Sequence, residues 1–309
     1  MSACLAPAPS MPRLPIPHSP AAAILTLIVA TLCLASHDTL AKYLAQGYPV
    51  PLLIWARYLV HLCAMSAIVA PRMGAAALRS SALGLHFLRA VCLVGIAYCF
   101  MNGLRYVPLA ESTAMVFLAP LFVLVISRLF YREQVRPVQW LAVAAGLAGV
   151  LLIVRPGGAL WTPAILLPGS CGVFFAVYQL LTRATGAVDG AAKSNFLVGL
   201  FGTALASVML PFFWQTPDAA GWAWMIALGL LGMMGHMLLA SAFKQASPVL
   251  LAPFGYFQIV FAVLLGYLVY DQHPDAWALL GMGMIALGGM ATVRAQQRRR
   301  RAERAAAQG

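Results

Sequence analysis

The sequence predicts an all-α integral membrane protein with ten transmembrane helices, arranged as two inverted five-helix repeats. Three observations predict this fold: an apolar composition, a series of long stretches without charged residues, and a similarity between the two halves of the chain. Of 309 residues, 62% are hydrophobic and only 9% are charged, whereas about 25% are charged in an ordinary soluble domain. The mean hydropathy is +0.86, so the chain belongs in a bilayer.

Each uncharged stretch has about the length of a membrane-spanning helix, roughly 20 residues. The stretches do not alternate apolar and polar residues as the strands of a membrane β-barrel do, so helices are favoured. Division of the chain at its Pro, Gly and charge clusters gives ten spans near 22–45, 51–70, 85–104, 108–130, 138–154, 162–183, 194–214, 219–242, 249–270 and 275–293.

The placement of Lys and Arg predicts the orientation of these spans, because cytoplasmic loops carry an excess of both. One set of loops is rich in them and the other has only Arg105 and Arg155, so we expect both termini in the cytoplasm and the chain in the inner (plasma) membrane. The tail 294–309 has six Arg and one Glu, which favours a topology anchor over a nucleic-acid site. The basic loop residues are Arg72, Arg79, Arg132, Arg136, Arg183, Lys193 and Lys244.

The two halves of the chain are similar at an offset of 139 residues, which pairs Phe122 with Phe261 and Tyr131 with Tyr270. Each half then has five spans, and this odd number forces the second copy into the membrane upside down, as in many secondary transporters. The predicted organisation is a Pro-rich N-terminal segment (1–21), a first repeat (22–155), a second repeat (156–293) and the basic tail (294–309).

Three segments make the chain resemble the EamA-type transporters of the drug/metabolite transporter superfamily. They are ARYLVHL in span two, LRYVPLAESTAMVFLAPLF running into RLFYREQ in span four, and SPVLLAPFGYFQIVFAVLLGYLVYDQHPD in span nine. The resemblance implies a ten-helix carrier of amino acids, cofactors, nucleotide sugars or drugs, often an exporter. One departure is that the acidic residue usual at the end of such spans is present as Glu133 but replaced by Gln272 in the second copy.

Charged residues inside spans one and two are the first site candidates, because each ionised group in hydrocarbon needs a partner or a watery cavity. Asp38 and Arg57 lie at similar depths on a predicted helical hairpin, so we expect them to pair, either as a clamp between helices or as a gate or substrate contact. Lys42, nearer the surface, is expected to extend its ammonium group outward.

Four other ionisable residues in the spans have both a structural and a functional interpretation. His61 is expected to be neutral and bonded to a neighbouring helix, with proton transfer as the alternative. Arg89 either anchors the cytoplasmic end of span three or has a functional role. Glu111 opens span four, where an acid favours the helix dipole, or provides a cation or proton site. His236 follows Gly229, Gly232 and Gly235, whose spacing permits close helix packing.

Prolines and glycines predict helix breaks at similar places in both halves, near Pro120 in span four and near Pro253 and Gly255 in span nine. Broken helices in matching halves indicate the binding region of a transporter. Polar side chains near these breaks or in span three are further candidates for substrate contacts, with simple packing as the alternative: Tyr98, Asn102, Tyr256 and Gln258, with Tyr178 and Gln179 as lesser ones.

The function predicted from these features is secondary transport of a small organic solute, with a proton as the expected coupling ion and facilitated exchange as the alternative. No P-loop, HExxH or GxSxG motif occurs, and the cysteines lack metal-ligand spacing, so no enzyme activity, cofactor or metal is predicted. The alternatives are an uptake carrier for a cofactor precursor or nucleotide-like metabolite, a membrane-embedded transferase, and a channel. The expected partners are the solute, protons and the bilayer, with a homodimer as a further option and no nucleic acid.

Overall fold

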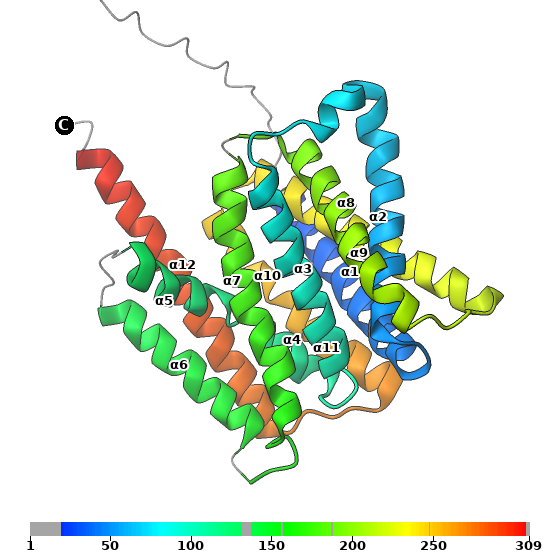
Figure 1. Cartoon of the computed structure of the whole chain (residues 1–309). Coiled ribbons are helices and arrows are strands. Elements are labelled where there is room, and N and C mark those ends of the chain that lie inside the picture. The colour runs from blue at the N-terminus through cyan, green and yellow to red at the C-terminus, as the bar shows by residue number, and fades with distance from the viewer. Residues whose placement is uncertain (1–19, 132–136, 156, 187, 247, 307–309) are drawn as a thin grey trace, which may run out of the picture.

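The computed structural model describes residues 20–131, 137–155, 157–186, 188–246 and 248–306. Within these ranges all of the regular secondary structure is helical (Figure 1). Short 3₁₀ turns at 74–78, 163–165 and 210–212 join some of the helices. The helices are α1 (Pro20–Gly47), α2 (Val50–Met73), α3 (Leu83–Gly103), α4 (Leu109–Val116), α5 (Ala119–Tyr131), α6 (Pro137–Val154), α7 (Leu166–Gly186), α8 (Ala191–Met209), α9 (Ala219–Gln245), α10 (Pro248–Gly255), α11 (Phe257–Tyr270) and α12 (Ala276–Ala306).

The described residues contain seven helical stretches that are long and apolar enough to cross a membrane, and the protein is a multi-pass membrane protein. Shorter apolar helices cover Val143–Val154, Phe257–Tyr270 and Ala276–Ala291. Every predicted span coincides with one helix or with a consecutive pair of helices. The pairs are α4 with α5 and α10 with α11, which replace the predicted fourth and ninth spans.

Both predicted helix breaks are present in the structure. The first falls at Phe117, after α4, and the second at Tyr256, after α10. They lie 139 residues apart (256 − 117), which is the offset of the sequence similarity. Pro120 stands in the first turn of α5, where its missing N–H costs no hydrogen bond. The rings of Phe117 and Tyr256 meet with centroids 5.1 Å apart, so the two breaks are in contact.

Helix packing has a reciprocal pattern between the halves of the chain. Helix α1 packs on α9, as α3 packs on α7, and α2 contacts α9, as α3 contacts α8. Helix α2 also packs on α8, and α6 on α12 along one side of the bundle (Figure 1). The pattern follows if α1 to α6 correspond in order to α7 to α12. The contact of α1 with α9 then corresponds to that of α7 with α3, and the contact of α2 with α9 to that of α8 with α3. The contacts of α2 with α8 and of α6 with α12 each join a helix to its own counterpart.

Glycines on α9 allow the first two helices to approach closely, as their spacing predicts. A Cβ added at Gly229 would lie 2.6 Å from Val60, one at Gly232 would lie 3.0 Å from His37, and one at Gly235 would lie 2.8 Å from Leu34. Larger residues there would separate α9 from α1 and α2. The contact therefore holds charged and imidazole side chains of the first half against the second half.

Candidate functional site

Asp38 lies at the centre of the helix bundle, where it is hydrogen-bonded by a side chain from the second half of the chain. One carboxylate oxygen is 3.0 Å from Nδ1 of His37, and the other accepts a hydrogen bond of 3.1 Å from Nε2 of Gln258 on α11. Asp38 and His37 are both buried. Because a carboxylate only accepts hydrogen bonds, Nδ1 of His37 is the donor in this contact.

The predicted pairing of Asp38 with Arg57 was wrong. Among the described residues, no ion pair within 4.0 Å joins these two side chains. Asp38 is instead held by His37 and Gln258, which bond one oxygen each. Arg57 is half-buried on α2, and within the described part of the chain its guanidinium has no hydrogen-bond or ion-pair partner.

Two further imidazoles extend this group, which we call the central cluster: His37, Asp38, Arg57, His61, His236 and Gln258. Nε2 of His61 is 3.3 Å from the backbone oxygen of Asn195 on α8, so this histidine bonds a neighbouring helix as expected. His236 on α9 has an accessible side chain and lies within electrostatic range of Arg57, His37 and His61. The cluster thus joins α1 and α2 of the first half to α9 and α11 of the second.

A second buried polar group, the Arg89 cluster, lies where α3, α7 and α8 meet. Arg89 is only 2% exposed. Its guanidinium donates to the hydroxyls of Thr185 at 3.2 Å and Tyr178 at 3.3 Å, and also to the hydroxyl of Ser194. The nitrogen that bonds Thr185 and Ser194, Nη1, is also 3.4 Å from Nδ1 of His86. Arg89 therefore does more than anchor one helix end, because it ties α3 to α7 and α8.

Asp189 extends the Arg89 cluster from the loop between α7 and α8. It contacts Nε2 of His86 at 2.9 Å and Nζ of Lys193 at 2.8 Å, and it accepts a hydrogen bond from Ser80. Lys193, followed by Ser80, holds the pKa of Asp189 well below its ordinary value. The sequence analysis missed His86 and Asp189. The spacing of His86 and Arg89, three residues apart on one helical face, was an available signal.

Lys42 and Glu111 are two further buried polar residues. The ammonium of Lys42 donates to the backbone oxygens of Leu104 at 2.5 Å and Val107 at 3.1 Å. These carbonyls lie in the connection between α3 and α4, so the side chain extends toward that end of the bundle but is held by protein and not by water. Glu111 lies in the first turn of α4, as expected, but is buried, and its Oε2 has no hydrogen-bond partner among the described residues.

The remaining predicted site residues lie apart from the central cluster's hydrogen bonds. Tyr98 is exposed, and the amide of Asn102 donates to the backbone oxygen of Tyr98 within α3. Tyr256 contacts Phe117 at the paired breaks. Among the lesser candidates, Tyr178 belongs to the Arg89 cluster.

Gln272, the departure from the family pattern, caps a helix of the other half. Its Oε1 accepts a 3.0 Å hydrogen bond from the backbone N–H of Leu109, the first residue of α4. This contact satisfies one of the N–H groups that a helix start leaves free. The corresponding acid, Glu133, lies outside the described residues.

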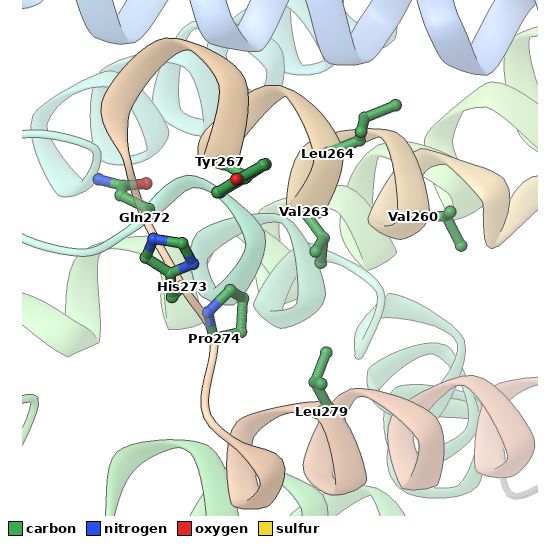
Figure 2. Close-up of a pocket in the computed structure, with 8 residues that line it drawn as sticks. All are labelled: Val260, Val263, Leu264, Tyr267, Gln272, His273, Pro274 and Leu279. Carbon is green, nitrogen blue, oxygen red and sulfur yellow. The ribbon is translucent and has the colours of Figure 1, made fainter.

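A groove of about 580 Å³ lies beside α11 and the start of α12. Figure 2 shows Val260 and Val263 extending from α11 toward the start of α12, where Leu279 lies across from them, and Leu264 also lines the groove. Tyr267, Gln272, His273 and Pro274 complete its lining. Because Val260, Leu264 and Leu279 are exposed apolar side chains on a membrane helix, the groove suits lipid chains better than a polar solute. It does not include the central cluster.

Comparison with known proteins identifies the class of this protein. The sequence pattern of the EamA-like transporter family matches residues 21–155 and again residues 162–294. The chain belongs to this family, and the predicted resemblance is confirmed. A solved crystal structure aligned at a TM-score of 0.59 covers 91% of this chain and 98% of the other at 22% identity, which shows a shared fold.

Curated relatives carry three different transport names. A riboflavin transporter of Vibrio cholerae is 26% identical over 88% of this chain and 93% of its own length. An S-adenosylmethionine uptake transporter of Rickettsia conorii is 26% identical over 67% of this chain and 71% of its own length. A pseudopaline exporter of Pseudomonas aeruginosa is 23% identical over 89% of this chain and 96% of its own length. The protein is a small-molecule transporter of this superfamily.

Proposed function

We propose that the protein is a secondary transporter that moves a small organic solute by alternating access between two inverted five-helix halves. One observation carries this proposal: the central cluster draws His37, Asp38 and Arg57 from the first half and His236 and Gln258 from the second. A site at the interface of two halves changes its access when the halves rock against each other. The contacting breaks at Phe117 and Tyr256 provide a place for this movement.

The two halves proposed are residues 22–155 and 156–293, which form ten spans. The family pattern matches each half separately, the helix breaks share the 139-residue offset, and the helix contacts are reciprocal. All three support a duplicated unit. Five spans in each unit would invert the second copy, as the predicted topology requires.

We place the protein in the inner membrane with both termini in the cytoplasm. Arg72, Arg79 and Lys193 stand at the ends of helices near the Arg89 cluster, so this cluster would seal the cytoplasmic side. The N-terminus of α1 and the C-terminus of α12 share that side in the proposed topology. The solute would then reach the central cluster from the cytoplasm only when α3 separates from α7 and α8.

Export is the proposed direction, which the name of the pseudopaline relative supports. Uptake of a cofactor precursor or nucleotide-like metabolite is the alternative, which the name of the S-adenosylmethionine uptake relative supports. A proton is the proposed coupling ion, because imidazole rings can take up and release protons and His37, His61 and His236 lie within electrostatic range of Arg57. Residues proposed to contact the solute or to gate its path are Asp38, Arg57, His61, Arg89, Tyr98, Asn102, Glu111, His236, Tyr256 and Gln258.

Counterflow in proteoliposomes tests the proposed function. Vesicles loaded with one unlabelled solute are diluted into the same labelled solute, using riboflavin, S-adenosylmethionine and individual amino acids in turn. A carrier predicts transient, saturable accumulation of label for at least one solute, abolished in empty vesicles. Flux that rises linearly with concentration and ignores the internal solute would indicate a channel, and covalent change of a lipid-linked substrate would indicate a transferase.

A further inference from the structure

The central cluster contains three polar groups that form no hydrogen bond with the described residues, and they come from three different helices. The guanidinium of Arg57 on α2 has no hydrogen bond or ion pair there, and its carbon lies 5.5 Å from the centroid of the Tyr58 ring. Nε2 of His37 on α1 is buried and has no hydrogen-bond partner in the described part of the chain, and His37 itself is only 5% exposed. The accessible ring of His236 on α9 likewise has no hydrogen bond within the described ranges. Buried polar groups nearly always have partners, so the buried nitrogen of His37 calls for an explanation. The half-buried charge of Arg57 calls for one as well.

Two of these side chains pack against Gly232 of α9. A Cβ built on Gly232 would lie 3.3 Å from Nε2 of His37 and 3.6 Å from Nε of Arg57. It would also lie 3.0 Å from Cδ2 of His37, which is tighter than an ordinary contact, so glycine lets the α9 backbone approach both side chains. His236 follows one helical turn later on α9, which places it on the same face as Gly232. Arg57 itself is half-buried, so part of its side chain is accessible beside this contact.

The guanidinium of Arg57 supplies the positive charge beside this contact. Asp38, the carboxylate of the central cluster, bonds His37 and Gln258 and forms no ion pair with Arg57 within 4.0 Å among the described residues. A charged side chain within a membrane helix costs roughly 2.5–3.5 kcal/mol on insertion scales. An arginine that had only a structural role would be expected to recover this cost through a partner, as Arg89 does.

We propose that Arg57 binds an oxyanion of the transported solute, a carboxylate or a phosphate, at the accessible part of its guanidinium, where α2 meets α9. The planar guanidinium matches two oxygens of either group with parallel hydrogen bonds. The proposal rests on the proposed function, and it narrows the cargo to solutes that carry an anionic group. Neutral and purely cationic solutes would be poor cargo.

The test is calorimetric titration of the detergent-purified full chain with inorganic phosphate, acetate and two matched pairs. The pairs are nicotinate with nicotinamide and riboflavin 5′-phosphate with riboflavin, so each differs mainly by its anionic group. We expect the anionic member to bind more tightly by about tenfold or more, which corresponds to about 1.4 kcal/mol. The two pairs also distinguish a carboxylate site from a phosphate site.

Variants separate the role of the charge from that of folding. Arg57→Gln should abolish the preference for the anionic member, and Arg57→Lys should restore part of it. Gly232→Ala keeps every charge but places a methyl group against His37 and Arg57, so it should weaken oxyanion binding by about tenfold. Its matched control is Gly169→Ala on α7, where an added Cβ meets nothing within 4 Å. Size-exclusion profiles identify any variant that fails to fold.

Two results would overturn the oxyanion site: equal binding of the charged and neutral members, or oxyanion binding that Arg57→Gln and Gly232→Ala leave unchanged. Absence of any heat change with all oxyanions at millimolar concentration would also overturn it. A failure of the proposed transport function can be distinguished from a failure of the oxyanion site. Counterflow of a neutral solute that persists in Arg57→Gln would keep the carrier and reject the oxyanion site, whereas oxyanion binding without counterflow of any solute would reject the carrier.

Discussion

Two arginines lie inside this protein, and their surroundings differ. Arg89 donates to three hydroxyls and stands beside His86, Asp189 and Lys193. Arg57 lies among imidazoles at the centre of the bundle and has no such partner in the described part of the chain. Both arginines lie where helices of the two halves meet, but among the described residues only Arg89 has acceptors for its hydrogen bonds.

The difference in hydrogen bonding indicates that the guanidinium groups of Arg89 and Arg57 have different roles. A satisfied polar network strengthens a particular arrangement of helices, because breaking it leaves several buried groups unpaired. An unsatisfied cation contributes nothing comparable to stability and is available to a ligand. The Arg89 cluster is therefore suited to holding one end of the bundle closed, and the central cluster is suited to binding.

Replacement of Arg89 by Met should produce the largest loss of stability. The guanidinium donates to buried hydroxyls, and hydrogen bonds from charged groups contribute about 1.5–3 kcal/mol each, so we expect a loss of roughly 3 kcal/mol. Thermal unfolding in detergent measures the change. An unfolding temperature equal to that of the wild type would show that the Arg89 cluster does not hold α3 against α7 and α8.

The second largest effect on stability is expected from acid, which protonates Asp189 in the Arg89 cluster. The pKa of Asp189 lies below its ordinary value of 3.8 because of Lys193, followed by Ser80. Its ionised form therefore contributes stability above pH 3.8 that is lost as the pH falls through the lower, folded-state pKa. We expect unfolding temperatures measured against pH to fall less steeply in Asp189→Asn than in the wild type. Parallel curves would contradict the role of this carboxylate.

Removal of the cap that Gln272 provides should have a smaller effect. Gln272→Ala leaves the N–H of Leu109 without its side-chain acceptor, and loss of a helix cap costs about 1 kcal/mol. Gln272→Glu keeps an acceptor and serves as the control. If Gln272→Ala unfolds at the same temperature as Gln272→Glu, the contact between the halves at α4 is not stabilising.

Replacement of Arg57 by Met should have the smallest effect on stability. Because no hydrogen bond or ion pair is lost among the described residues, the change should fall within about 0.5 kcal/mol, as for substitutions away from specific networks. Guanidinium or thermal unfolding beside Arg89→Met makes the comparison direct. A loss as large as that of Arg89→Met would show that Arg57 supports the fold.

Much of the fold followed from composition and spacing, whereas the partners of the polar groups did not. Apolar runs located the membrane helices, although α12 continues past the predicted end at residue 293 to Ala306. Prolines located both breaks to within a few residues. The partner of Asp38, however, is Gln258, 220 residues away, and that of His86 is Asp189, 103 residues away. These pairings depend on the rotation and depth of packed helices, which a hydropathy pattern does not determine.

The most direct test measures apo stability and ligand response in one set of thermal unfolding experiments on the wild type, Arg57→Gln and Arg89→Gln. The ligand is the anionic solute that binds in the calorimetric panel, at about 100 times its dissociation constant, where it should stabilise the wild type by about 2.7 kcal/mol. The account predicts that Arg57→Gln has the unfolding temperature of the wild type without ligand but is not stabilised by the ligand. Arg89→Gln should unfold at a lower temperature without ligand and should still be stabilised by the ligand. A ligand response retained in Arg57→Gln, or lost only in Arg89→Gln, would contradict the account.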